Sequence, residues 1–158
     1  FLMEGAVREA LHRLKYSNLR AIAPLLGTLL ADSLTAQQVP GTALVPVPLH
    51  RRRERQRGYN QAYLLAREAG KRLGLPVLPH ALSRVVNTSP QVKSSGAQER
   101  RANVIGAFRC LHPHLVREQA VVLVDDVCTT GATLEACAVA LREAGATSVW
   151  GVTLAREA

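Results

Sequence analysis

The chain has 158 residues, of which 47% are hydrophobic and 20% are charged, and its formal net charge is +8. This length predicts one domain with a single core, and this composition excludes an intrinsically disordered chain. No run of about 18 apolar residues occurs, which excludes a membrane-spanning helix, while the positive charge favours polyanionic partners such as nucleotides or nucleic acid.

Two helices are predicted at the start of the chain, over residues 4–15 and 22–34, because apolar residues recur there at helical spacing. Acidic Glu4 and the basic residues Arg8 and Arg13 are scattered through the first of these segments, which does not resemble a signal peptide. We therefore expect a cytoplasmic protein whose first two elements are helices.

A short buried strand is predicted over residues 43–47, and Pro46 and Pro48 place it at a strand end or a sheet edge. The next segment, residues 50–57, has five arginines in the seven residues from Arg51 and is expected to be a loop. Two interpretations of this loop are open. It is a solvated arginine run, or its amides and guanidinium groups bind a highly charged anion.

A helix with a buried apolar face is predicted over residues 61–73, where Gly74 ends it and Pro76 prevents its continuation. The segments after it are predicted to be a strand over 81–86, a mobile polar loop over 87–98, a short basic turn or helix over 99–103, a strand over 106–110 and a break at 112–114.

Residues 121–133, with the sequence VVLVDDVCTTGAT, combine a buried strand, an acidic edge and a turn of hydroxyls and glycine that leads into a helix. The apolar run 121–124 predicts the strand, and apolar residues at helical spacing from Leu134 predict the helix. Backbone N–H groups and threonine hydroxyls at a helix N-terminus suit a phosphate monoester, and carboxylates suit sugar hydroxyls or hydrated Mg²⁺. The alternative is an ordinary strand–turn–helix in which Asp and Thr act as capping residues.

Gly145 is expected to end this helix, and residues 147–154 form the last predicted strand. Strands that alternate with helices predict an α/β fold, a mostly parallel sheet with helices on both faces. Ligands of such sheets bind at the carboxyl ends of the strands. The segments after residues 47 and 124 both follow strands, so we expect them to share one pocket.

The segment 121–133 resembles the PRPP motif of type I phosphoribosyltransferases, where PRPP is phosphoribosyl pyrophosphate. The resemblance implies that Asp125 and Asp126 face the ribose hydroxyls, act in catalysis and bind Mg²⁺, directly or through water. It also implies that the following turn holds the 5-phosphate through Thr129, Thr130, Gly131, Ala132 and Thr133.

Three segments together resemble the ComF family of phosphoribosyltransferase-like proteins: VPVPLHRRRERQRGYNQA, RVVNTSPQVKSSGAQERRANVIGAF and VVLVDDVCTTGAT. The resemblance spans nearly the whole chain and implies one phosphoribosyltransferase-like (Rossmann-like) domain over 1–158, with residues 1–36 in the hood that covers the site. Leu14, Lys15 and Tyr16 fit the same pattern. The zinc-binding cysteine cluster that members often carry at the N-terminus is not seen in this chain.

Further site residues follow from the same resemblance. The pyrophosphate-binding residues are Leu49, His50, Arg51 and Arg57, followed by the motif residues Gly58, Asn60 and Gln61. The flexible segment that closes over the substrate includes Arg84, Thr88, Gln91, Arg100, Arg101 and Asn103. For Arg100 and Arg101 a structural helix start is an equal alternative, and His50 is either a proton donor or polar surface.

The function implied is binding of PRPP with Mg²⁺ and transfer of its phosphoribosyl group to a nitrogen acceptor with release of pyrophosphate, linked to DNA uptake in natural competence. The alternative is a non-catalytic accessory protein that binds single-stranded DNA or senses a phosphoribosyl ligand, with the competence machinery as its partner. Nothing in the sequence indicates the acceptor or the oligomeric state.

The three cysteines, Cys110, Cys128 and Cys137, are far apart in the sequence and contain no CxxC pair. This pattern favours reduced thiols over a disulfide framework or a structural zinc site. Cys128 lies within the turn, either as a nucleophile or as a small side chain in a tight loop. The aromatic residues Tyr16, Phe108 and Trp150 are expected to lie in the core or at an interface.

Overall fold

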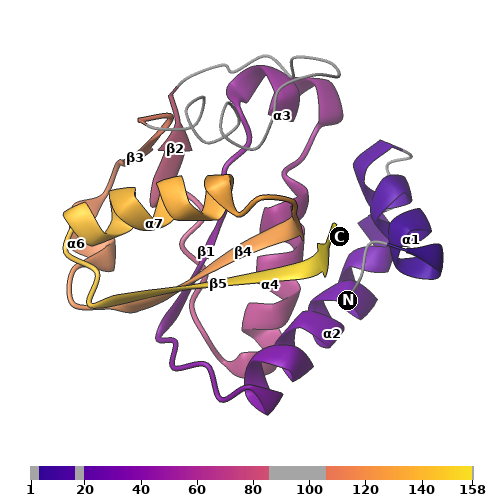
Figure 1. The fold of residues 1–158 in the computed structure, drawn as a ribbon, viewed down its shortest axis with the longest axis horizontal. Coiled ribbons are helices and arrows are strands. Elements are labelled where there is room, and N and C mark those ends of the chain that lie inside the picture. Colours follow the sequence, from indigo (N-terminus) through magenta and orange to yellow (C-terminus); the bar gives the residue numbers. More distant parts are fainter. Residues whose placement is uncertain (1–3, 17–19, 86–105, 158) are drawn as a thin grey trace.

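The computed structural model describes residues 4–16, 20–85 and 106–157. Its elements, in chain order, are α1 (Gly5–Tyr16), the 3₁₀ turn η1 (Arg20–Ile22), α2 (Ala23–Ala36), β1 (Ala43–Pro46), α3 (Arg51–Arg57), α4 (Gln61–Leu73), β2 (Leu82–Arg84), β3 (Phe108–Cys110), α6 (Pro113–Val116), β4 (Ala120–Cys128), α7 (Ala132–Glu143) and β5 (Ser148–Arg156) (Figure 1).

A parallel sheet with the strand order β1-β4-β5 lies at the centre of the fold. Val124 of β4 lies opposite Pro46 of β1 on one side and Val152 of β5 on the other. Beyond β1, an isolated parallel bridge joins Leu44 to Val77. The predicted mostly parallel sheet is confirmed, and Pro46 ends its strand as the two prolines predicted.

Helices cover both faces of this sheet, with α7 on one face and α2 and α4 on the other (Figure 1). Side chains alternate along β4, so Val122 and Val124 pack with α2 and α4, whereas Val121 and Leu123 pack with α7. All four side chains are at most 1% exposed. A strand that is buried on both faces has a continuous run of apolar residues, and this run made β4 predictable from the sequence.

The N-terminal helices were predicted correctly. In α2, a Cβ added to Gly27 would lie 2.5 Å from the Cβ of Glu68, so a glycine is required for α2 to approach α4 this closely. In α1, Leu11 and Leu14 are 0% exposed and belong to the same core cluster as α2 and α4. The first two elements are therefore integral to the core.

An antiparallel pair, β2 and β3, stands beside the central sheet, with Arg84 opposite Phe108. Both strands were predicted, and Phe108 is 7% exposed, as expected of a core residue. Trp150 is 47% exposed on β5, so it does not lie in the core, and its place at an interface stays a prediction. The side chain of Tyr16 lies outside the part of the chain that the structure describes.

The expected loop over residues 50–57 is wrong, since Arg51–Arg57 forms the helix α3. His50 caps this helix by accepting a hydrogen bond at Nδ1 from the N–H of Arg52, 3.2 Å away. Gly58 ends it in the left-handed region, with φ of 81°. Arginine, glutamate and glutamine are good helix formers, and this propensity favours a helix over the segment.

Two further boundaries differ from the prediction. Residues 112–114 were predicted to be a break, but the short helix α6 begins at Pro113. The ring of this proline presets the helical φ. The strand predicted over 121–124 extends to Cys128, because β4 continues to pair with β5 as far as Arg156. Asp125 and Asp126 therefore lie within the strand, near its carboxyl end.

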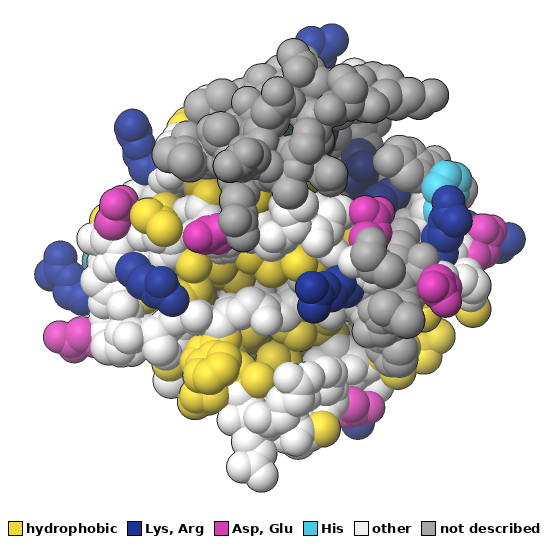
Figure 2. Space-filling model, viewed as in Figure 1, with side chains coloured by type: hydrophobic (Ala, Val, Ile, Leu, Met, Phe, Trp, Pro, Cys, Tyr) yellow, Lys and Arg dark blue, Asp and Glu magenta, His cyan; other side chains and the backbone are white. Residues whose placement is uncertain are grey.

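Apolar side chains gather on the face that α7 and β5 present (Figure 2). Val139 of α7 is 48% exposed and Trp150 of β5 is 47% exposed. Within the described ranges, every helix is too short or too polar to traverse a lipid bilayer.

Candidate functional site

The two segments that the sequence singled out lie side by side at one edge of the sheet. The N–H of Val47, just after β1, donates a hydrogen bond to the carbonyl of Val124, 2.9 Å away. The amide Nδ2 of Asn60 donates to the carbonyl of Val47 at 3.0 Å. The predicted neighbourhood of the chain after residue 47 and the chain after residue 124 is thus observed.

The two carboxylates leave β4 toward different faces of the sheet, because consecutive side chains of a strand alternate. Asp126 follows Val122 and Val124 to the side of α1, and its carboxylate Oδ2 lies 2.9 Å from the ammonium nitrogen of Lys15. Asp125 follows Leu123 to the side of α7. The two acids nevertheless lie close enough for the charge of Asp126 to act on Asp125.

Burial and then the negative charge of Asp126 raise the pKa of Asp125 well above its ordinary value. Two groups act in the opposite direction, the N–H of Asp126, which donates to Oδ1 of Asp125 at 2.8 Å, and the more distant charge of Lys15. Burial and the neighbouring negative charge therefore both disfavour the ionised form of Asp125.

The turn after β4 leads directly into the N-terminus of α7. Gly131 adopts φ of 78°, and a Cβ at this position would meet nothing within 4 Å, so the space above it is open. The hydroxyl of Thr130 accepts a hydrogen bond from the N–H of Ala132 at 3.4 Å. The next N–H groups, of Thr133 and Leu134, belong to the first turn of α7, where helix geometry provides no acceptor. Thr129 at the tip is exposed.

The motif residues Asn60 and Gln61 are structural in this chain. Asn60 is 8% exposed and caps α4, since its Oδ1 accepts from the N–H groups of Ala62 and Tyr63. Gln61 is 4% exposed, and its Oε1 accepts a hydrogen bond from Arg57. Together they fix the chain between α3 and α4 rather than presenting groups to a ligand.

The residues predicted to bind pyrophosphate are divided by α3. Leu49 and His50 precede the helix and are half-buried, and Arg51 begins it and is exposed. Arg53 is half-buried and close enough to Arg84 of β2 to affect its pKa. The sequence did not single out Arg53, although helical spacing places it one turn before Arg57, on the inner side of the segment.

Arg84 is the last residue of β2, on a paired strand, and its Cζ lies 5.4 Å from the ring centroid of Phe108. Burial and then the positive charge of Arg53 lower the pKa of Arg84, whereas Cys137 and Asp125 raise it. Arg84 is thus a cation held between α3 and the acid of β4. The other residues predicted for the flexible segment, Thr88, Gln91, Arg100, Arg101 and Asn103, lie outside the described residues.

Lys15 is the group that sequence reasoning missed as a neighbour of the acids. It lies on α1, next to Leu14, whose carbonyl accepts a hydrogen bond from the hydroxyl of Tyr59. The resemblance had included Lys15 only as part of a short motif. No local pattern links it to Asp126, because the two residues meet through packing across the whole chain.

Among the described residues, no three His, Cys, Asp or Glu side chains gather to hold a metal ion. Cys110, Cys128 and Cys137 form no disulfide in this structure. Cys128, half-buried at the end of β4, accepts a backbone hydrogen bond from Glu157 through its carbonyl. The acid pair alone supplies too few ligands for Mg²⁺, which coordinates about six oxygens, so an ion there needs oxygens from water or from a ligand.

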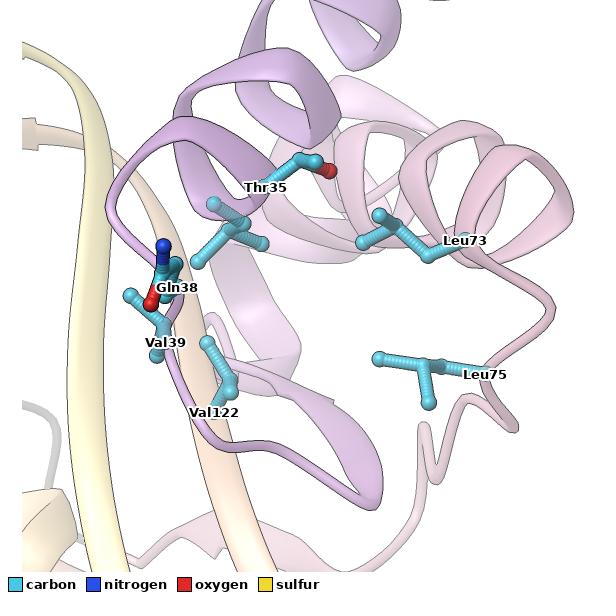
Figure 3. Close-up of a pocket in the computed structure, with 7 residues that line it drawn as sticks. Thr35, Gln38, Val39, Leu73, Leu75 and Val122 are labelled. Atoms are coloured by element: carbon cyan, nitrogen blue, oxygen red, sulfur yellow. The ribbon is translucent and has the colours of Figure 1, made fainter.

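A separate cavity of about 150 Å³ lies at the opposite end of the sheet, between the ends of α2 and α4 and the start of β4 (Figure 3). Its lining consists of Leu34, Thr35, Gln38, Val39, Leu73, Leu75 and Val122. These seven residues carry no charge, so the cavity does not suit an anionic ligand. The acids and the Gly131 turn remain the candidate site.

Comparison with known proteins shows the family of the chain. A family model described as "Phosphoribosyl transferase domain" matches residues 56–158. Competence protein F of Haemophilus influenzae is 35% identical over 153 residues, which are 92% of this chain and 66% of that protein. DNA utilization protein YhgH of Escherichia coli K12 is 37% identical over 144 residues, or 88% of this chain and 62% of that protein. Competence protein ComFC of Bacillus subtilis is 38% identical over 114 residues, or 72% and 44%.

Solved structures show the same fold. Glutamine PRPP amidotransferase from B. subtilis, complexed with ADP and GMP, superposes with a TM-score of 0.59 at 21% identity, over 85% of this chain and 26% of that one. At this identity the likeness concerns the fold alone. The chain spans only 66% and 62% of the length of the first two curated relatives.

Proposed function

The chain belongs to the phosphoribosyltransferase domain family, in its ComF branch. We propose that it binds PRPP and transfers the phosphoribosyl group to a nitrogen acceptor, releasing pyrophosphate. One observation carries the proposal. An acid pair, Asp125 and Asp126, and a glycine turn at the N-terminus of α7 stand on the same strand end.

The charges of the site match the proposed ligand. The 5-phosphate would accept hydrogen bonds from the turn over residues 129–133, in the positive field at the start of α7. The ribose hydroxyls would donate to Asp125 and Asp126. The diphosphate carries most of the negative charge, and Arg84 and Arg53 are the nearby half-buried cations that would neutralise it.

Mg²⁺ is part of this proposal. With the diphosphate present, the carboxylates of Asp125 and Asp126 fit a divalent ion that they contact directly or through water. When bound, the ion would neutralise charge on the departing pyrophosphate.

The chemistry asked of the protein is positioning and charge stabilisation. The bond from C1 of ribose to the diphosphate oxygen breaks, the bond from C1 to the acceptor nitrogen forms, and the nitrogen loses a proton to solvent. The acids would orient the ribose, and the arginines would hold the leaving anion. Cys128 needs no role as a nucleophile in this scheme.

Turnover provides the test. Protein, Mg²⁺ and PRPP are mixed with a panel of bases and amines, and pyrophosphate release is followed. We expect release with one acceptor and its loss in the Asp125→Asn/Asp126→Asn variant. The exposed Asp32, which pairs with Arg72 away from the site, provides the control variant Asp32→Asn. Release that persists without both acids would contradict the assignment.

A second candidate function is binding of single-stranded DNA, in keeping with the names of the relatives, which include competence and DNA utilization proteins. The outer face of α3 has a hollow of about 390 Å³ lined by Arg51, Glu54, Arg55 and Gly58. Its two arginines would contact phosphates. Affinity for an oligonucleotide should then fall steeply with salt, and Arg51→Ala/Arg55→Ala should flatten this dependence. Salt-insensitive binding, or none, would count against this function.

A further inference from the structure

The N-terminal helix supplies the counter-charge of the acid pair. The ammonium nitrogen of Lys15 lies 2.9 Å from Oδ2 of Asp126, and the two side chains are 21% and 6% exposed. A carboxylate that is this buried is costly unless a cation pairs with it. This contact is therefore unlike the exposed pair of Arg13 and Glu9 on the same helix, whose side chains are 56% and 61% exposed.

The part of α1 that carries Lys15 is held from several sides. Leu11 and Leu14, on the same helix, are 0% exposed in the core. The hydroxyl of Tyr59 donates to the carbonyl of Leu14, and the guanidinium carbon of Arg20 lies 4.5 Å from the centroid of the Tyr59 ring. The packing of α1 thus places Lys15 where its ammonium group reaches Asp126.

This arrangement leaves little room for a metal ion in the ligand-free site. The ammonium group of Lys15 forms an ion pair with Oδ2 of Asp126, and the N–H of Asp126 donates a hydrogen bond to Oδ1 of Asp125. A divalent cation that bound both carboxylates would have to share Asp126 with an ammonium group, and the two positive charges would repel each other at close range.

We propose that Lys15 is a resident counter-cation that keeps the acid pair from holding a divalent ion until a ligand brings its own phosphates. Mg²⁺ then enters the site together with the ligand. The identity of that ligand rests on the proposed function, whereas the effect of Lys15 on free cations concerns the ligand-free chain alone.

The experiment titrates ligand-free protein with Mn²⁺, a paramagnetic stand-in for Mg²⁺, and measures free Mn²⁺ by electron paramagnetic resonance. Wild type and Lys15→Arg should bind Mn²⁺ weakly. Lys15→Met should bind one ion at least about tenfold more tightly, because the repelling charge is removed while both acids remain. Lys15→Met/Asp126→Asn should lose this gain.

Arg13→Met is the matched control, since it removes the same charge from the same helix at an exposed position. It should leave Mn²⁺ binding as in wild type. Thermal melting checks that each variant is folded, and Lys15→Gln replaces Lys15→Met if the methionine variant is not. Equal Mn²⁺ affinity in wild type and in the folded uncharged variant would overturn the proposal, as would a gain that survives Asp126→Asn.

The failure of this inference is distinguishable from failure of the proposed function. A separate calorimetric titration of wild type with PRPP and Mg²⁺ tests the ligand. Absence of PRPP binding with a Mn²⁺ gain in Lys15→Met would refute the ligand and retain the counter-cation. PRPP binding without a Mn²⁺ gain in Lys15→Met would retain the ligand and refute the counter-cation.

Discussion

The hydroxyl of Tyr59 donates a hydrogen bond to the carbonyl of Leu14, 45 residues earlier in the chain, and both residues are buried. This bond joins the end of α1 to the segment between α3 and α4. It connects the helix that carries Lys15 with the segment whose Asn60 holds the chain after β1. We therefore expect the N-terminal helix and the site to unfold together.

Tyr59→Phe tests this connection. The variant leaves the carbonyl of Leu14 without its buried donor, so the free energy of unfolding should fall by about 1–3 kcal/mol. Urea denaturation measures the change. Tyr63→Phe, in the first turn of α4 and half-buried, is the control and should stay within about 0.5 kcal/mol of wild type. Equal effects of the two substitutions would show that the hydroxyl of Tyr59 has no special role.

Asn60→Ala removes two functions of one side chain, the cap of α4 and the hydrogen bond to Val47. Loss of a cap costs about 1 kcal/mol, and the carbonyl of Val47 loses its Asn60 donor, so we expect a total loss of roughly 2–3 kcal/mol in stability. The measurement is again urea denaturation. A loss below 0.5 kcal/mol, which is about the scatter of surface substitutions, would contradict the structural role assigned to this residue.

Gly131→Ala and Gly74→Ala form a matched pair, because both glycines have positive φ, 78° and 67°, and neither has an atom within 4 Å of an added Cβ. Each variant should lose about 1 kcal/mol of stability through backbone strain. Only Gly131 lies at the site, so only Gly131→Ala should also weaken binding of a phosphorylated ribose. Equal ligand affinity in the two variants would remove the turn from the site.

The raised pKa of Asp125 predicts a pH-dependent stability. Its pKa is raised in the folded state, so between the unfolded and the folded value the native chain keeps a proton that the unfolded chain has lost. Stability contributed by this group is therefore present at low pH and is lost as pH rises through the folded pKa. The pKa of Asp125 is affected by the charges of Asp126 and Lys15. The charge of Asp125 in turn raises the pKa values of Arg84 and Cys137.

Asp125→Asn should accordingly raise the melting temperature at pH 8 and raise it less, or not at all, at pH 4.5. Calorimetric melting across this range checks the difference, and Asp32→Asn, at an exposed position, provides the baseline. An increase in melting temperature that is the same at both values of pH would show that ionisation of Asp125 does not destabilise the folded chain.

Much of the architecture was predictable because its signals are local. The apolar run 121–124 could only be a buried strand or a piece of buried helix, and the acids and glycine after it marked a strand end. Gly74 and Pro76 predicted where α4 ends, and they were correct. Such features depend on a few neighbouring residues, which is why one sequence was enough.

The wrong or missed predictions concern features that are not determined by the local apolar pattern. The extension of β4 to Cys128 depends on Ala155 and Arg156 of β5, which supply its pairing partners. The helix α3 depends on the cap by His50, a residue rarely assigned that role. The contact of Lys15 with Asp126 requires α1 to pack at the carboxyl end of β4, which no local pattern reports.

A phosphorylated ribose should bind at Asp125, Asp126 and the Gly131 turn. Isothermal titration calorimetry with PRPP and Mg²⁺ tests it most directly, on wild type, on Asp125→Asn and on the control Asp32→Asn. We predict one PRPP bound per chain, with affinity at least about tenfold lower in Asp125→Asn and unchanged in Asp32→Asn. No binding to wild type, or equal affinity in all three proteins, would contradict the account.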